Sequence, residues 1–198
     1  MKIGPLLLLA SFAVAQIDES KALHLPGDRK LVLVAFDGGP NITNLGYNIR
    51  VNDKSSLRRK WVVINDPTCP VQISHAGIET VVDSGISGYA FRAKGEIVAK
   101  DPISAYTVTF VIYDPFGERI ESLGLTRVQD LEGSQDLGDK FRWTANENDV
   151  SEYLSSVVFV RKVLTKAGKA WSFSEKDLLG GFKAIDLQIK PEEMKATK

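Results

Sequence analysis

Short runs of apolar and β-branched residues, each closed by a turn, recur along almost the whole chain and limit what it can fold into. No segment shows a long apolar pattern with the 3.6-residue period of a helix. Many short strands separated by glycine, proline, asparagine and aspartate are typical of antiparallel sandwiches, so we predict an all-β protein. The expected strands are residues 31–36, 45–51, 61–64, 71–73, 77–82, 89–98, 106–113, 118–128, 141–144, 154–164, 170–173 and 184–189.

The clearest of these strands covers residues 106–113. Its bulky apolar side chains, such as Tyr106 and Phe110, alternate with Thr107 and Thr109, so the two sets lie on opposite faces of a sheet. The sequence Asp114-Pro115-Phe116-Gly117 follows, and proline at its second position is typical of a tight turn. The strand and its turn therefore predict a β-hairpin that continues into residues 118–128.

Residues 1–15 have the composition of a cleaved secretory signal peptide. A basic start at Lys2 is followed by an apolar run that ends in Ala13-Val14-Ala15, a pattern typical of a signal cleavage site. The apolar run is too short to span a bilayer comfortably. We expect the mature protein to begin at Gln16 and to be periplasmic or secreted, with no transmembrane segment after cleavage.

The rest of the chain divides by pattern into four parts. Residues 16–28 are polar and aperiodic, which predicts a flexible lead-in. Residues 29–58 predict an N-terminal β-hairpin extension, and residues 59–189 the main sandwich. Residues 190–198 are charged and predict a flexible tail.

Tyr153 stands just before the strong strand 154–164. In immunoglobulin-like sandwiches a tyrosine near the start of the sixth strand sends its hydroxyl back to upstream backbone, and here Asp149 precedes it by four residues. Ser155 replaces the cysteine of antibody domains, which leaves sandwiches without a disulfide, such as fibronectin type III domains. We therefore predict an antiparallel immunoglobulin-like β-sandwich. The alternative is a single helical turn capped by Asp149, with Tyr153 as an ordinary core residue.

The segment Phe110-Val111-Ile112-Tyr113-Asp114 resembles the signature of FxLYD domains, with isoleucine in place of leucine. Gly95 before it and Gly117 after it fit the same pattern, and the resemblance covers about residues 89–122. The chain departs from the family at residues 98–100, where an asparagine is usual. The resemblance implies an extracytoplasmic β-sandwich module with no known catalysis, in which Phe110, Tyr113 and Asp114 are structural residues.

Composition argues against several classes of function. The chain has 25 basic and 25 acidic residues, so its zero net charge gives no electrostatic reason to bind nucleic acid. Cys69 is the only cysteine, which leaves no internal disulfide and no cysteine-based zinc site. Lying between Pro67 and Pro70, Cys69 is expected to be a small buried residue, with a free or intermolecular thiol as the alternative. Asn41 begins a glycosylation sequon, which matters only in a eukaryotic source.

No grouping of residues predicts catalysis, a metal site or a bound cofactor. We therefore expect an exported, non-enzymatic binding or scaffolding module whose partner is another protein. One alternative is carbohydrate recognition through exposed aromatic side chains, for which the candidates are Trp61, Trp143, Trp171 and Tyr89. The other is an envelope-assembly accessory that offers a free edge strand, with residues 31–36 as the candidate.

Overall fold

A computed structural model describes most of the chain and contains mainly β-strands. Strands make up 64% and helices 12% of it, which confirms the all-β class. The expected signal peptide, Asn41 and most of the expected strand 45–51 lie outside the described residues. The structure describes residues 17–26, 29–40, 42–44, 50–51, 57–83, 88–138 and 141–197.

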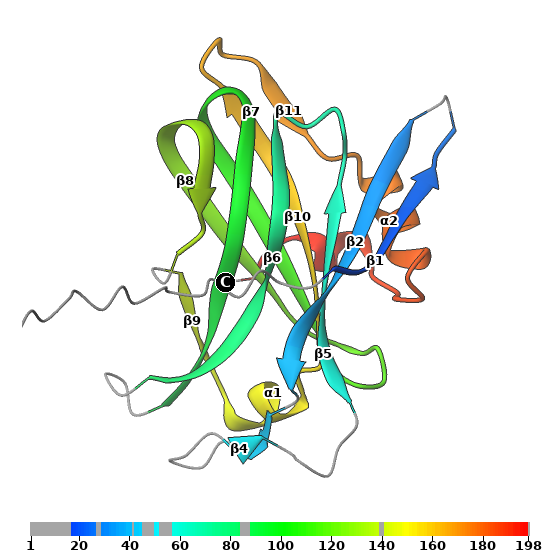
Figure 1. Ribbon diagram of the computed structural model, residues 1–198, viewed down its shortest axis with the longest axis vertical. Coiled ribbons are helices and arrows are strands. Elements are labelled where there is room, and N and C mark those ends of the chain that lie inside the picture. Colours follow the sequence, from blue (N-terminus) through cyan, green and yellow to red (C-terminus); the bar gives the residue numbers. More distant parts are fainter. Residues whose placement is uncertain are drawn as a thin grey trace, which may run out of the picture.

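Nine strands form one curled sheet, and two short strands form a separate pair (Figure 1). The main path runs β1-β2-β5-β10-β7-β6, while β11 pairs with β10 and both β8 and β9 pair with β7. In this order along the path, the strands are β1 (Ile17–His24), β2 (Lys30–Pro40), β5 (Arg58–Asn65), β10 (Ser155–Thr165), β7 (Gly88–Tyr113) and β6 (Val71–Asp83). The others are β8 (Arg119–Asp136), β9 (Arg142–Ala145) and β11 (Ala170–Ser172), with β3 (Ile42–Asn44) and β4 (Arg50–Val51) as the separate pair.

The length of β7 converts this single sheet into two packed layers. Residues 88–99 of β7 pair with β6, and residues 103–113 pair with β10. The register of the β7–β8 pairing breaks between Ala99 and Ile103, where the strand passes from one layer to the other. We call the layer of β1, β2, β5, β10, β11, the second part of β7 and the first part of β8 the large layer. The small layer consists of β6, β9, the first part of β7 and the last part of β8.

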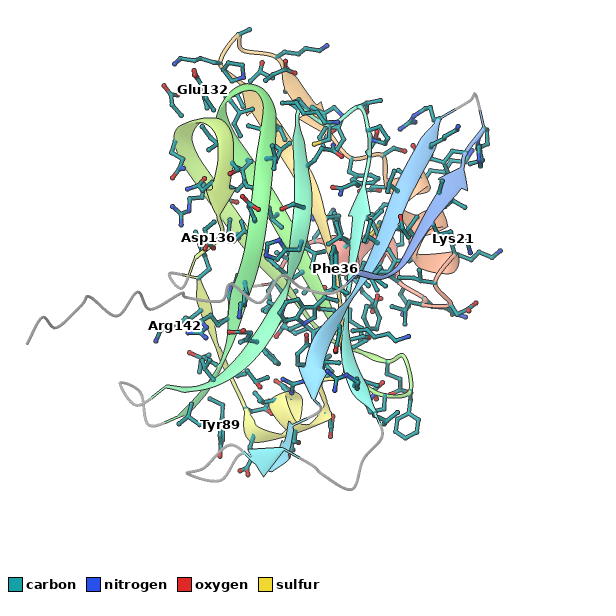
Figure 2. All side chains as sticks on the ribbon, viewed as in Figure 1. Lys21, Phe36, Tyr89, Glu132, Asp136 and Arg142 are labelled. Atoms are coloured by element: carbon teal, nitrogen blue, oxygen red, sulfur yellow. The ribbon has the colours of Figure 1, made fainter. Side chains whose placement is uncertain are left out.

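The main core lies between the two layers. Alternate residues of the large layer point into it, and Phe36, Trp61 and Phe110 are examples. The small layer contributes Ile78 and Phe91 from the other side. Figure 2 shows Phe36 near the middle of the molecule, whereas Lys21 and Glu132 lie at its periphery.

The opposite face of the large layer is partly buried by a helix and a terminal turn. Val111, Val157 and Phe159 point to this face and pack with residues of α2 (Glu175–Lys183) and η1 (Pro191–Met194). Gly181 lets α2 approach the sheet, because a Cβ there would lie 3.2 Å from Ile64 Cδ1. The strands at the centre of the large layer are therefore apolar on both sides, which explains their continuous hydrophobic runs.

The structure differs from the sequence expectations at the N-terminal end. Residues 17–24 form β1 rather than a flexible lead-in, because they pair antiparallel with β2. Residues 31–36 are not a free edge, since β2 lies between β1 and β5. The hairpin partner of β2 is thus β1. Residues 50–51, the described part of the predicted second strand of the hairpin, pair with β3 instead.

The C-terminal end differs as well. The sequence predicts a strand over residues 184–189, but they follow α2 as turns and chain without regular secondary structure. The sequence predicts a loose tail from residue 190, yet Met194 is only 2% exposed. It belongs with Phe159 and Phe182 to the buried cluster between the large layer and α2, which we call the second core cluster. Both differences arise because this segment packs against a sheet face that its own local pattern does not reveal.

One strand pair departs from the antiparallel expectation. β5 and β10 run parallel, with Trp61 opposite Ser156 and Val63 opposite Val158. All other pairs in the large layer are antiparallel, so the sheet is mixed. The antiparallel prediction is therefore wrong for this central pair, although the all-β class holds.

Candidate functional site

Asp114 and Tyr113 serve the turn and the second core cluster rather than a reactive site. The Asp114 carboxylate accepts hydrogen bonds from the backbone N–H groups of Phe116 at 2.9 Å and Glu118 at 2.7 Å. Gly117 follows with φ of +80°, which a glycine adopts without strain. Tyr113 is buried beside Phe182 of α2, at 6.3 Å between ring centroids. Phe110 packs between the layers against Trp143.

Tyr153 is the centre of a buried polar cluster. Its hydroxyl donates to the carbonyl oxygen of Ile78 at 2.9 Å and accepts from Trp61 Nε1 at 3.1 Å. The Arg59 guanidinium lies over its ring, 4.4 Å from the centroid. The hydroxyl thus reaches upstream backbone, but on β6 in the facing layer rather than a few residues away.

Asp149 does not cap the short helix α1 (Glu147–Glu152). The cap is Asn146, whose side chain accepts from the backbone N–H of Asp149 at 2.8 Å. The Asp149 carboxylate in turn accepts from Asn146 Nδ2 at 2.7 Å. Both carboxylate and cap therefore stabilise the start of the helix that delivers Tyr153 to the core.

The tryptophans do not form an exposed platform. Trp61 is buried at 6% exposure, and Trp143 and Trp171 are half-buried against the core. Trp171 Nε1 also donates to Thr68 Oγ1 at 3.2 Å. Tyr89 is half-buried near the start of β7 (Figure 2). These four side chains are therefore poor candidates for stacking on a sugar.

Cys69 is buried and takes part in no disulfide. Burial raises the pKa of its thiol to about 12, so almost no thiolate forms near neutral pH. We expect the folded protein to resist iodoacetamide at pH 8 and the protein in guanidinium chloride to react at the rate of a free thiol. Mass spectrometry of timed samples measures both rates. Equal rates in the two conditions would contradict the buried, protonated thiol.

Part of the large layer has an outer face that the described helices leave uncovered. We call this part, on β11, β10, β7 and β8, the open face. Pairing aligns Ala170, Leu164, Ala105 and Val128 into one row across the four strands. Val128 is 85% exposed and Leu164 is 41% exposed. An apolar row therefore crosses the sheet in contact with solvent.

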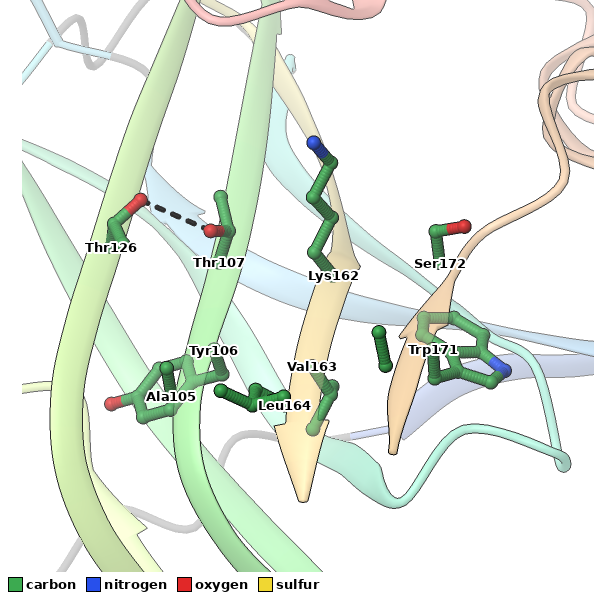
Figure 3. A pocket seen from close by; sticks show the side chains of 10 residues that line it. Ala105, Tyr106, Thr107, Thr126, Lys162, Val163, Leu164, Trp171 and Ser172 are labelled. Carbon is green, nitrogen blue, oxygen red and sulfur yellow. Dashed lines mark hydrogen bonds between the residues drawn. The ribbon is translucent and has the colours of Figure 1, made fainter. Parts of the chain in front are cut away.

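A polar row runs beside the apolar one on the same face. It consists of Ser172, Lys162, Thr107 and Thr126, again one residue from each strand. The hydroxyl oxygens of Thr107 and Thr126 lie 3.0 Å apart, within hydrogen-bonding distance. These side chains, which Figure 3 shows, line a shallow depression. Its volume is about 360 Å³. Trp171 lies at its edge on β11 (Figure 3).

Charged residues border the open face. Lys166 Nζ lies 3.2 Å from Asp130 Oδ2 and 3.9 Å from Glu132 Oε1. Lys162 lies inside the border and forms no ion pair with any residue that the structure describes. The face thus combines exposed apolar side chains, hydroxyl groups and one cation whose charge is available to a partner.

The sequence does not predict the open face, although the alternation of buried and exposed residues in β8 points to one of its members. Thr126, Val128 and Asp130 fall on the solvent side of β8, opposite the buried Leu125 and Leu131. Val128 is the one apolar residue of the first three, which marks it as unusual for an exposed position. Which residues of β10 and β7 stand beside it depends on strand pairing, and the sequence does not reveal that.

No cluster of histidine, cysteine, aspartate or glutamate suited to a metal ion occurs in the described part of the chain. Among the same residues, no helix has the length and apolarity needed to cross a membrane. Comparison of the chain with protein-family models, with curated proteins and with solved structures gives no match.

Proposed function

We propose that the protein is an exported, non-enzymatic binding module that docks another protein on its open face. The observation that carries this proposal is the solvent-exposed row of Ala170, Leu164, Ala105 and Val128 on four adjacent strands. Single exposed apolar residues are common, but a contiguous apolar row with a polar border is typical of an interaction surface.

The composition of the open face favours a protein over a sugar as the partner. Apolar side chains form its middle, and the Lys166–Asp130 ion pair lies at its border. Protein interfaces share this plan of an apolar centre and a polar rim. A sugar partner calls for exposed aromatic rings, whereas Trp61 is buried and Trp171 packs against Phe173. The envelope-assembly alternative loses its named strand, because β2 is paired on both sides.

The decisive test changes the two most exposed apolar side chains of the face. Leu164→Asp combined with Val128→Asp places two carboxylates in the apolar row, so we expect capture of the native partner to fall at least tenfold. Both positions are exposed, so each substitution is expected to change the free energy of unfolding by only about 0.5 kcal/mol. Cross-linking of the tagged protein in its native envelope or medium, followed by mass spectrometry, measures the capture.

Val82→Asp is the matched control. Val82 is 38% exposed on β6, in the small layer, and carries the same chemical change on another surface. Capture should be unaffected by this substitution. Equal losses in the control and the double variant, or no loss in either, would refute docking on the open face.

Export is tested separately from docking. Cleavage after Ala15 should give a mature protein that begins at Gln16, since small residues occupy both recognition positions. Intact mass measurement of the natively expressed protein reads the N-terminus directly. A dominant species that retains Met1 would refute export through a cleaved signal.

A further inference from the structure

The C-terminal residues 190–197, which we call the strap, cover the sheet beside the open face. Ser122 Oγ donates to the carbonyl oxygen of Glu193, and Arg161 Nη1 donates to that of Met194 at 2.7 Å. The backbone N–H of Thr197 donates to the carbonyl oxygen of Ser122 at 2.9 Å. All three bonds engage the main chain of the strap, which forms the turn η1 over Pro191–Met194 and is extended at Lys195. Main-chain hydrogen bonds of this kind are one way in which a protein binds a peptide.

The strap and the open face lie on consecutive parts of the same strands. Phe159 and Gly124 flank Thr109 in the row next to the polar row of the open face. Met194 lies in the core cluster that contains Phe159, and it borders a depression of about 310 Å³. Lys162 and Ser172 line both this depression and that of the open face. The strap therefore occupies one end of a longer continuous groove.

The strap fits the surface beneath it imperfectly. Tyr113 Oη and Thr109 Oγ1 are buried and have no hydrogen-bond partner among the described residues. Arg119 Nε lies 3.5 Å from Glu193 Oε1 and likewise lacks a hydrogen bond there. Buried polar groups without partners oppose the folded arrangement. Met194 is the only side chain of the strap that is fully buried.

We propose that the strap is a displaceable ligand of a peptide groove, and that a peptide of the partner replaces it. This proposal rests on the proposed function and names what the partner presents. The peptide carries an acidic residue followed by methionine or leucine, as Glu193-Met194 does in the strap. Arg119 and Arg161 provide the complementary charge, and Lys162 extends it toward the open face.

Native-state hydrogen exchange on the unmodified protein tests displacement first. The backbone N–H of Thr197 reports on the strap, and that of Leu178, which donates to Ser174 in α2, reports on the helix beside it. We expect Thr197 to exchange at least 100-fold faster than Leu178, at a rate that does not depend on low denaturant concentrations. Exchange of Thr197 only through global unfolding would overturn the proposal.

Peptide binding in trans tests the groove itself. The probe is a fluorescein-labelled synthetic peptide with the sequence of residues 188–197. In the full chain, Met194→Asp should release the strap and increase the affinity for the probe at least tenfold over the unmodified protein. Lys195→Asp, at an exposed neighbouring position, should leave it unchanged. A probe with aspartate in place of its methionine should not bind.

Equal affinity of Met194→Asp and the unmodified protein for the probe would overturn the strap proposal. That result would leave the capture experiment intact, because Leu164 and Val128 make none of the strap contacts described above. If Met194→Asp does not fold, the exchange of Thr197 in the unmodified protein decides alone. Loss of capture in the open-face variant together with a fixed strap would separate the two proposals.

Discussion

Gly77→Ala is expected to destabilise the fold by more than about 3 kcal/mol, since the core has no space for the added methyl group. A Cβ built on Gly77 lies 2.0 Å from Trp61 Cδ2 and 2.1 Å from Trp61 Cγ. Trp61 cannot move aside easily, because its indole N–H donates to the Tyr153 hydroxyl in the middle of the core. Denaturant unfolding of the two proteins, compared at equal slope, measures the loss.

Gly180→Ala provides the matched control for this substitution. Gly180 lies in α2, and a Cβ there meets only Leu25 Cδ2 at 3.8 Å, an ordinary contact. Alanine is favoured over glycine in a helix by about 1 kcal/mol, so this variant should be neutral or slightly more stable. Making Gly77→Ala in a Trp61→Leu background should reduce its cost, because the clash is removed. A Gly77→Ala protein as stable as the unmodified one would contradict the packing described here.

Arg59→Met is expected to cost about 3 kcal/mol or more, because buried hydrogen-bond acceptors are left without a donor. The Arg59 guanidinium donates to Thr80 Oγ1 at 2.8 Å and to the carbonyl oxygens of Tyr153 and Val150 at 3.3 and 3.4 Å. No carboxylate neutralises it among the described residues, and burial lowers its pKa. Removing this buried charge offsets part of the loss, but methionine cannot bond the three oxygens.

Arg58→Met is the matched control, because it removes an exposed arginine next to the buried one. The Arg58 side chain is 58% exposed and pairs with Asp37, so its replacement should cost less than about 1 kcal/mol. Tyr153→Phe should fall between the two at roughly 1–3 kcal/mol, since it leaves Ile78 O and Trp61 Nε1 unpaired. Similar losses for Arg58→Met and Arg59→Met in chemical denaturation would refute the assigned role of Arg59.

Strands can be predicted from the sequence where burial on one face of the sheet makes apolar and polar residues alternate. Tyr106, Val108, Phe110 and Ile112 all point into the main core, as their alternation predicts. The turn at Asp114 also follows from local chemistry, because its carboxylate bonds backbone N–H groups only two and four residues away. Local periodicity and turn residues are therefore sufficient for the all-β class and for this hairpin.

The sequence carries a local signal for the C-terminal helix, which is absent from the strands predicted above. Ser174 caps α2 by accepting from the backbone N–H of Asp177, and Leu178 and Phe182 follow at helical spacing. The neighbouring Gly180 and Gly181 obscured this pattern. The N-terminal strand β1 has no comparable signal, because most of its residues are polar and they form a strand by pairing with β2.

Local patterns along the chain are sufficient for the class of the fold and for the inward faces of its longest strands, because both depend on residues close together in sequence. The parallel pairing of β5 with β10 depends on long-range packing, since it joins residues about a hundred positions apart. The same long-range packing creates the candidate site. Leu164 and Val128 belong to one row because both pair with Ala105. They are exposed because α2 and the strap cover only the adjoining part of the sheet.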